Sequence, residues 1–144
     1  MRHIILIAHN IRSLHNVGSL FRTAEGAGVR KIYLSGYTGT PPRKEISKVA
    51  LGSETRVPWE HKKSISRLIK GLREDGYEIL ALEQSAHSLP YSDHKTCKKI
   101  AIIVGNEVRG LSRRVLELSD KIIEIPMLGT RKSLNVSVAA GIAL

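Results

Sequence analysis

The sequence predicts an α/β fold, a parallel β-sheet flanked by helices, and two observations predict it. Short, continuous apolar runs recur along the chain, as at residues 4–8 and 100–104, and strands that are buried on both faces have this pattern. Segments with apolar residues at helical spacing lie between these runs. No internal repeat or interdomain linker interrupts the alternation, so we expect a single domain over residues 1–144.

The elements are expected in the following order. A strand over residues 3–9 leads to a helix over residues 16–28, which begins at the capping residue Asn16 and ends at Gly26 and Gly28. The later strands are expected at residues 31–35, 77–82, 100–104 and 121–125, with a short edge strand at 56–59. The later helices are expected at residues 44–51, 64–75, 111–118 and 135–144, and residues 85–96 are expected to be irregular. The last helix reaches residue 144 without a capping residue, so it either ends there or is truncated.

The composition is strongly basic. Lys and Arg number 23 and Asp and Glu number 13, which gives a formal net charge of +10. Because basic side chains that neutralise phosphates release counterions, this charge predicts a polyanionic partner such as RNA. A basic surface that is merely solvated is the alternative interpretation of the charge. One Trp, four Tyr and one Phe are too few for a base-stacking platform of the kind that single-strand binders use.

Composition also excludes several classes of protein. Cys97 is the only cysteine, so the chain has no intrachain disulfide framework and no multi-cysteine zinc site. The six histidines show no metal-ligand spacing, and we expect no metal. The apolar runs are too short to span a bilayer, and the first residues lack the features of a signal peptide. We therefore expect a soluble, cytoplasmic domain that does not associate with membranes.

Two segments place polar residues where open α/β sheets bind ligands, beyond the carboxyl ends of strands. In the first, Asn16 and Arg22 lie six residues apart on the first predicted helix, and we expect both to border one cleft. In the second, Gly105, Asn106 and Glu107 directly follow a buried strand, and Gly105 would let a ligand approach the backbone. The plainer interpretations are a helix cap with a surface charge, and an ordinary turn.

A third segment joins the last predicted strand to the last helix. A glycine-bearing loop leads to Ser133, Asn135 and Ser137 at the start of this helix. Backbone N–H groups and hydroxyls at such a start can bind a ligand. The alternative is a simply capped helix, since Ser133 and Asn135 are both good capping residues.

Together these segments resemble the three motifs of the SpoU/TrmH family of the SPOUT superfamily, which are S-adenosylmethionine-dependent RNA 2′-O-ribose methyltransferases. The matching stretches are Asn16-Val-Gly-Ser-x-x-Arg22-Thr-Ala, Gly105-Asn-Glu-x-x-Gly-Leu-Ser, and Ile125-Pro-Met-x-Gly followed by Ser133-Leu-Asn-Val-Ser-x-Ala-Ala. They occur in the family's order and reach from residue 10 to the end of the chain. Three motifs at family-like spacing are a far more specific signal than any one of them.

The resemblance implies a SPOUT-type fold with a C-terminal trefoil knot, and a homodimer with its active site near the interface. It implies that S-adenosylmethionine is held in the knot, largely by backbone groups, around Leu82, Glu83, Gly105, Ile125, Met127, Ser133 and Leu134. Arg22 matches the family's catalytic arginine, and the residues expected to support it are Asn16, Glu107, Ser133 and Asn135.

The implied reaction is an in-line transfer of a methyl group from a sulfonium to a ribose 2′-oxygen of tRNA or rRNA. A guanidinium stays protonated, so we expect Arg22 to hold the adjacent phosphate and orient the hydroxyl, and the proton acceptor is unassigned. Two alternatives stay open. One is a non-catalytic RNA-binding or assembly factor on the same fold, and the other is a related methyltransferase that acts on a base nitrogen.

Overall fold

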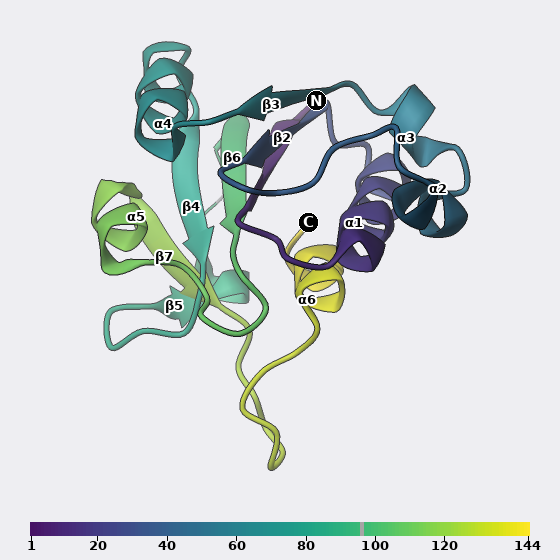
Figure 1. The fold of residues 1–144 in the computed structure, drawn as a ribbon. Coiled ribbons are helices and arrows are strands. Elements are labelled where there is room, and N and C mark those ends of the chain that lie inside the picture. The colour runs from purple at the N-terminus through teal and green to yellow at the C-terminus, as the bar shows by residue number, and fades with distance from the viewer. Residues whose placement is uncertain (96) are drawn as a thin grey trace.

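The computed structural model describes residues 1–95 and 97–144, and a single β-sheet organises them (Figure 1). Within these residues the sheet has seven strands in the order β3-β2-β1-β6-β4-β7-β5, and every neighbouring pair is parallel. The strands are β1 (His3–His9), β2 (Lys31–Ser35), β3 (Trp59–Lys62), β4 (Glu78–Leu82), β5 (Leu89–Pro90), β6 (Lys99–Val104) and β7 (Lys121–Glu124). The predicted parallel α/β fold is confirmed.

Helices cover both faces of the sheet (Figure 1). One face carries α1 (Leu14–Gly26), α2 (Lys44–Ala50), the single turn α3 (Ser53–Arg56) and α6 (Val136–Ala143). The other face carries α4 (Ile65–Glu74) and α5 (Arg113–Leu118), and a short 3-10 turn (Tyr91–Asp93) follows β5. Among the described residues, no helix has both the length and the apolar character needed to cross a membrane.

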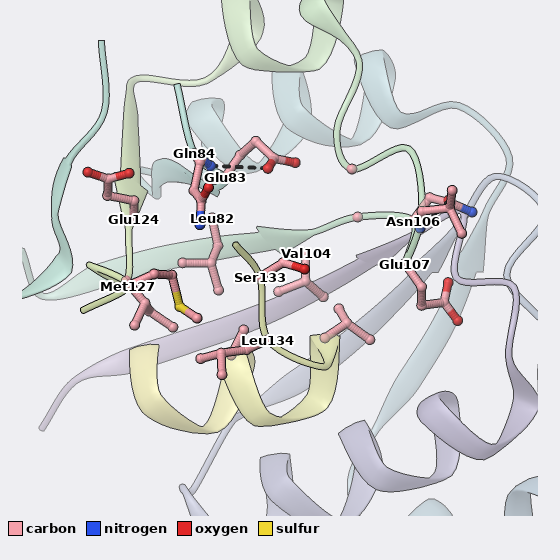
Figure 2. Close-up of a pocket in the computed structure, with 16 residues that line it drawn as sticks. Leu82, Glu83, Gln84, Val104, Asn106, Glu107, Glu124, Met127, Ser133 and Leu134 are labelled. Carbon is pink, nitrogen blue, oxygen red and sulfur yellow. Dashed lines mark hydrogen bonds between the residues drawn. The ribbon is translucent and has the colours of Figure 1, made fainter. Parts of the chain in front are cut away.

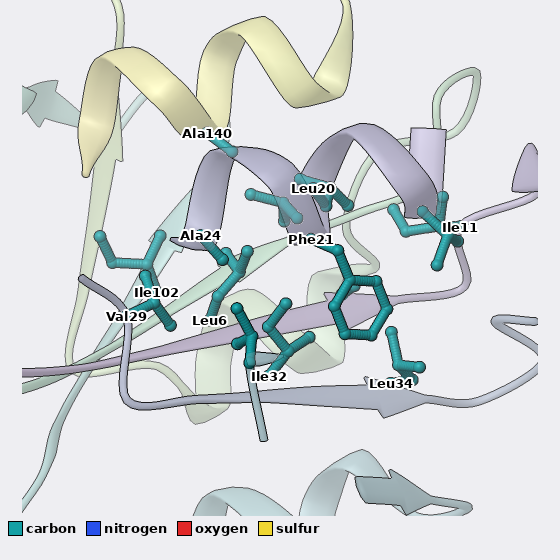
Figure 3. Packing of buried hydrophobic residues seen from close by; sticks show 14 of the residues in the cluster. Leu6, Ile11, Leu20, Phe21, Ala24, Val29, Ile32, Leu34, Ile102 and Ala140 are labelled. Carbon is teal, nitrogen blue, oxygen red and sulfur yellow. The ribbon is translucent and has the colours of Figure 1, made fainter. Parts of the chain in front are cut away.

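The central strands are apolar throughout because they face a core on each side. In β1, Leu6 and Ala8 pack in the cluster under α1, whereas Ile5 and Ile7 pack in the cluster under α4 and α5. Phe21 of α1 is fully buried and is one of the largest side chains in the first cluster (Figure 3). Continuous apolar strands of this kind are what a parallel sheet covered on both faces requires.

Most of the expected boundaries are within two residues of those in the structure, but the stretch expected to be irregular contains β5 and the 3-10 turn. Two of the misplaced boundaries have a clear local reason. The first helix begins two residues earlier than expected, because the side chain of Ser13 caps it by accepting a hydrogen bond from the Asn16 N–H at 3.2 Å. Asn16 therefore lies inside α1. The expected edge strand at 56–59 is displaced: residues 53–56 form a helical turn, and β3 begins only at Trp59. Sheet edges are short and weakly patterned, so the sequence signal there is poor.

The strand ends define where a ligand can bind. Because all neighbouring strands are parallel, their carboxyl ends share one edge of the sheet, and the loops after β1, β4, β6 and β7 gather there. The last helix, α6, packs against α1, which brings the C-terminal segment to the same region (Figure 1). The threading of this segment into a knot stays a prediction.

Candidate active site

A pocket of about 200 Å³ opens at the carboxyl edge of the sheet (Figure 2). Its walls come from the ends of β4, β6 and β7, from the loop between β7 and α6, and from the first turn of α6. The seven residues that the resemblance assigns to the cofactor all line it: Leu82, Glu83, Gly105, Ile125, Met127, Ser133 and Leu134. Segments spread over more than 50 residues of sequence therefore meet in one cavity, although the role of each residue stays a prediction.

Beside this pocket, three predicted site residues form one hydrogen-bonded chain. Asn16 Nδ2 donates to Glu107 Oε2 at 2.9 Å, and Asn135 Nδ2 donates to Asn16 Oδ1 at 3.1 Å. Asn16 is 91 residues from Glu107 and 119 residues from Asn135 along the chain. A carboxylate can only accept hydrogen bonds, so Glu107 fixes which end of the Asn16 amide faces it, and the amide oxygen is left for Asn135.

The Glu107 carboxylate also binds the start of α1. It accepts hydrogen bonds from the backbone N–H groups of Arg12 at 2.9 Å and Ser13 at 2.8 Å. Partial burial raises the pKa of Glu107, but the hydrogen bonds from Arg12, Asn16 and Ser13 lower it by more, so the pKa lies below its ordinary value. Glu107 is therefore an anion at neutral pH, and it holds the loop after β6 against α1.

At the third motif, Asn135 is the cap of α6. Its Oδ1 accepts hydrogen bonds from the Ser137 N–H at 2.9 Å and from the Ser137 hydroxyl at 2.5 Å. The expectation that this helix start offers its N–H groups to a ligand is therefore wrong for Ser137, because Asn135 already binds it. Ser133 lies in the loop just before the cap and lines the pocket.

The glycines after β6 serve the chain itself. A Cβ on Gly105 would lie 2.6 Å from Leu111 Cδ2 and 2.9 Å from the carbonyl carbon of Gly110, so packing within the chain requires a glycine here, and Gly105 also lines the pocket. Gly110 has a φ of +66°, and a Cβ there would clash with Glu83 Oε2, which accepts a hydrogen bond from the Leu111 N–H at 2.8 Å. Glu83 thereby fixes the loop after β6 to the end of β4.

Arg22 lies apart from this cluster. It is exposed on α1 and does not line the pocket, and within the described residues no ion pair or hydrogen bond holds its side chain. The expectation that Asn16 and Arg22 border one cleft is therefore wrong for a single chain. Six residues of helix turn the two side chains about 120° apart, so Asn16 faces Glu107 and Arg22 faces solvent.

The sequence analysis assigned no ligand-binding role to several residues around the pocket. Gln84, Asn106, Val108, Gly110, Glu124, Val136 and Ala139 also line it. Asn106 was noted only as a polar residue after a strand, yet its Nδ2 donates to the Asn10 carbonyl at 3.1 Å and to the Tyr37 hydroxyl at 2.8 Å. Gln84 Nε2 donates to the Lys132 carbonyl at 2.6 Å, which ties the loop before α6 to the end of β4. The sequence signal that could have indicated a binding role for Gln84 and Asn106 was their position just after the ends of two predicted strands.

A family model described as the SpoU rRNA methylase family matches residues 3–144. The chain belongs to the SpoU rRNA methylase family. Among its relatives, it is 35% identical over 141 residues to "23S rRNA (guanosine-2'-O-)-methyltransferase RlmB" of Vibrio vulnificus, covering 98% of this chain and 57% of that protein. It is 33% identical over 144 residues to "tRNA (guanosine(18)-2'-O)-methyltransferase" of Aquifex aeolicus, covering 99% of this chain and 67% of that protein.

Solved structures of SpoU relatives agree with the fold. The AdoMet-bound rRNA methyltransferase of Sinorhizobium meliloti superimposes with a TM-score of 0.91 at 27% identity, covering 98% of this chain and 54% of that one. This SpoU chain thus spans a little over half the length of the Vibrio and Sinorhizobium proteins.

Proposed function

We propose that this chain transfers a methyl group from S-adenosylmethionine to a ribose 2′-hydroxyl of tRNA or rRNA, as a cytoplasmic homodimer. One observation carries the proposal: the residues that the motifs assign to the cofactor line a single pocket, and Asn16, Glu107 and Asn135 are hydrogen-bonded to one another beside it. Relatives that match almost the whole chain are named as 2′-O-methyltransferases of rRNA and tRNA, and these names support the same chemistry.

The lining of the pocket suits this cofactor. Its apolar part includes Leu82, Val104 and Leu134, which can cover an adenosine and an aliphatic chain. Its ionisable part is acidic: the described lining contains three carboxyl groups and no Lys, Arg or His, the carboxyl groups being those of Glu83, Glu107 and Glu124. A sulfonium is a cation, and nearby carboxylates favour it. When bound, S-adenosylmethionine supplies the electrophilic methyl carbon.

The residues of the chain would then position the reaction rather than carry the methyl group. The Glu107 carboxylate accepts three hydrogen bonds and so fixes α1 to the loop after β6. Asn16 is in turn hydrogen-bonded to Asn135, which fixes the start of α6 as well. These bonds set the relative position of the walls that would hold the donor and the hydroxyl, which is the main requirement of an in-line transfer. Arg22 would bind the phosphate beside the target ribose through its guanidinium fork.

A homodimer would bring Arg22 to an active site that its own chain does not reach. Arg22 is exposed and lies outside the pocket, so a second copy facing α1 could place its pocket next to it. Large apolar side chains stay exposed on and before α6, namely Leu134 at 38%, Val138 at 50% and Ile142 at 41%. A pocket of about 200 Å³ is also smaller than the ~300–1,000 Å³ of typical ligand sites, so a second copy could complete its walls.

Methylation of total RNA with labelled S-adenosylmethionine, followed by nuclease mapping of the modified nucleotide, tests the proposal. We expect a ribose-methylated nucleoside, and the mapped position would identify the RNA. A base-methylated product would favour the nitrogen methyltransferase. If calorimetry detected no binding of S-adenosylmethionine, the proposal would fail in favour of a non-catalytic RNA-binding factor.

A mixture of R22A and N135A chains would test the dimer. Sedimentation would show whether mixed dimers form. An activity assay of these dimers should then show activity at one of the two sites, because that site would combine the intact Asn135 of one copy with the intact Arg22 of the other.

A further inference from the structure

Another cavity among the described residues, with a volume of about 710 Å³, lies on the face of the sheet that carries α4. It is a groove lined by residues of α4 and by Tyr33 of β2 and Lys62 of β3. The helices of this face, α4 and α5, bury their apolar residues against β1, β4 and β6, so the outer strands are left uncovered beside α4. Tyr33 of β2 is half-buried and contributes the floor.

One end of this groove is basic. Lys62 ends β3, Lys63 follows it, and Arg67 lies on the first turns of α4, and all three are exposed. Glu60 binds Lys62 at 2.8 Å and Lys31 at 2.9 Å, and these two lysines lower the pKa of Glu60 to about 2. In contrast, the side chains of Lys63 and Arg67 have no ion pair or hydrogen bond within residues 1–95 and 97–144, so their charges are available to an external anion.

The acidic residue of the groove is at its other end. Asp75 caps the C-terminus of α4, about 12 Å along the helix from Arg67. The basic end is therefore the one at the carboxyl edge of the sheet, which is also the edge where the candidate active-site pocket opens. From β3 to β6 there are three strand spacings, a lateral offset of about 14 Å, so one extended polyanion could reach both places.

Gly71 keeps the groove open at a cost to the helix. It lies in the interior of α4, where glycine is less favourable than alanine. A Cβ at this position would meet no atom within 4 Å, so packing within the chain does not require a glycine here. A side chain at 71 would instead project into the groove, which Gly71 lines.

We propose that this groove is an RNA-binding surface, in which Lys63 and Arg67 contact backbone phosphates of the substrate outside the nucleotide that enters the pocket. The inference rests on the proposed function, because it takes RNA to be the substrate. The ligand class follows from the two cations that have no partner among the described residues, the open space beside Gly71 and the shared sheet edge.

Binding of bulk tRNA, measured by filter binding across a range of NaCl concentrations, tests the groove. The charge-reversal variant K63E/R67E should bind about tenfold more weakly at 100 mM salt, and the slope of log K against log salt should fall by about 1.4–1.8 for two lost phosphate contacts. The control K44E/K48E makes the same charge change on α2, on the other face of the sheet, and should lose less than twofold. Equal losses in both variants, or no loss in K63E/R67E, would overturn the proposal.

A second variant changes no charge. Gly71→Leu should fold at least as stably as the wild type, since leucine favours helices and meets open space, and it should bind tRNA about threefold more weakly by filling the groove. Wild-type affinity in G71L would also overturn the proposal. Calorimetry with S-adenosylmethionine distinguishes RNA binding in the groove from the proposed methyl transfer: both groove variants should bind S-adenosylmethionine normally. If the wild type bound tRNA through the groove but did not bind S-adenosylmethionine, the proposed reaction would fail while the groove survived.

Discussion

Replacing Glu107 with Gln tests the carboxylate that joins the loop after β6 to α1. The carboxylate accepts hydrogen bonds from Arg12 N–H at 2.9 Å, from Ser13 N–H at 2.8 Å and from Asn16 Nδ2 at 2.9 Å. A carboxamide has one accepting oxygen, so its amino group must face at least one of these donors. A hydrogen bond to a charged group contributes about 1.5–3 kcal/mol to stability. Glu107 is exposed, so screening by solvent reduces the contribution of each of its hydrogen bonds. We expect E107Q to lower the free energy of unfolding by about 2 kcal/mol.

The loss should depend on pH in a defined direction. The pKa of Glu107 is lower in the folded chain than in the unfolded chain, where an ordinary Glu has a pKa of about 4.3. The stabilisation by the carboxylate is therefore fully present above this pH, and it is lost as the pH falls through the folded pKa. Urea unfolding followed by circular dichroism at pH 7 and pH 3 should show a difference between wild type and E107Q that shrinks at the lower pH.

The matched control is Glu117→Gln. Glu117 makes an i,i+4 ion pair with Arg113 at 3.1 Å, and both side chains are largely exposed, so its loss should cost less than about 0.5 kcal/mol. If E107Q were as stable as E117Q at pH 7, Glu107 would not hold the loop to α1. If the deficit of E107Q were the same at pH 3 as at pH 7, its cause would not be the charge of the carboxylate.

Substitutions at three further motif positions test the remaining contacts, with Gly26 as a control position outside the motifs. Asn135→Ala and Asn135→Ser both remove the hydrogen bond to Asn16 Oδ1, but Ser keeps a capping oxygen for α6, so N135S should be about 1 kcal/mol more stable than N135A in urea unfolding; equal stabilities would argue against capping. Gly18→Ala places a Cβ 2.6 Å from a carbonyl oxygen of α2 and should cost about 1–3 kcal/mol in thermal melts. Its control is Gly26→Ala, which meets nothing within 4 Å and should melt at or slightly above the wild-type temperature, because alanine favours helices. Arg22→Lys keeps the charge but loses the guanidinium fork, so turnover in the labelled-donor assay should fall strongly while calorimetry shows only a modest loss of S-adenosylmethionine binding; normal turnover would remove Arg22 from the mechanism.

The fold was predictable where burial on two faces dominates the sequence. The boundaries of β1 and β2 match the expected ones because continuous apolar runs end there in polar residues or turns. The edge of the sheet was not predictable in the same way. β3 has half-buried and exposed residues, and the preceding residues 53–56 turn as a helix, so no strong periodicity distinguishes them. The two-residue strand β5 is too short to leave any pattern.

The site was predictable as a set of loops, but the partners of its side chains were not. The order of strands and helices shows that the loops after β4, β6 and β7 share one sheet edge, and the motifs select residues within these loops. Nothing local shows that Asn16 binds a carboxylate 91 residues away rather than capping its own helix. Ser13 was the better cap because it precedes the helix by one residue, and this left the Asn16 side chain free for Glu107.

The distribution of charge resolves an apparent conflict in this protein. A chain with a formal net charge of +10 would repel a cationic ligand, yet the proposed methyl donor carries a positive sulfonium. The described lining of the candidate active-site pocket is acidic, through Glu83, Glu107 and Glu124, whereas Lys63 and Arg67, which have no ion pair with any described residue, lie on the face of the sheet that carries α4. Because Coulomb interactions between exposed groups are screened beyond about 10 Å at 0.1 M salt, the two regions can act independently. The cationic methyl donor and the anionic RNA can thus bind near the same edge of the sheet, the donor beside acidic side chains and the RNA beside basic ones.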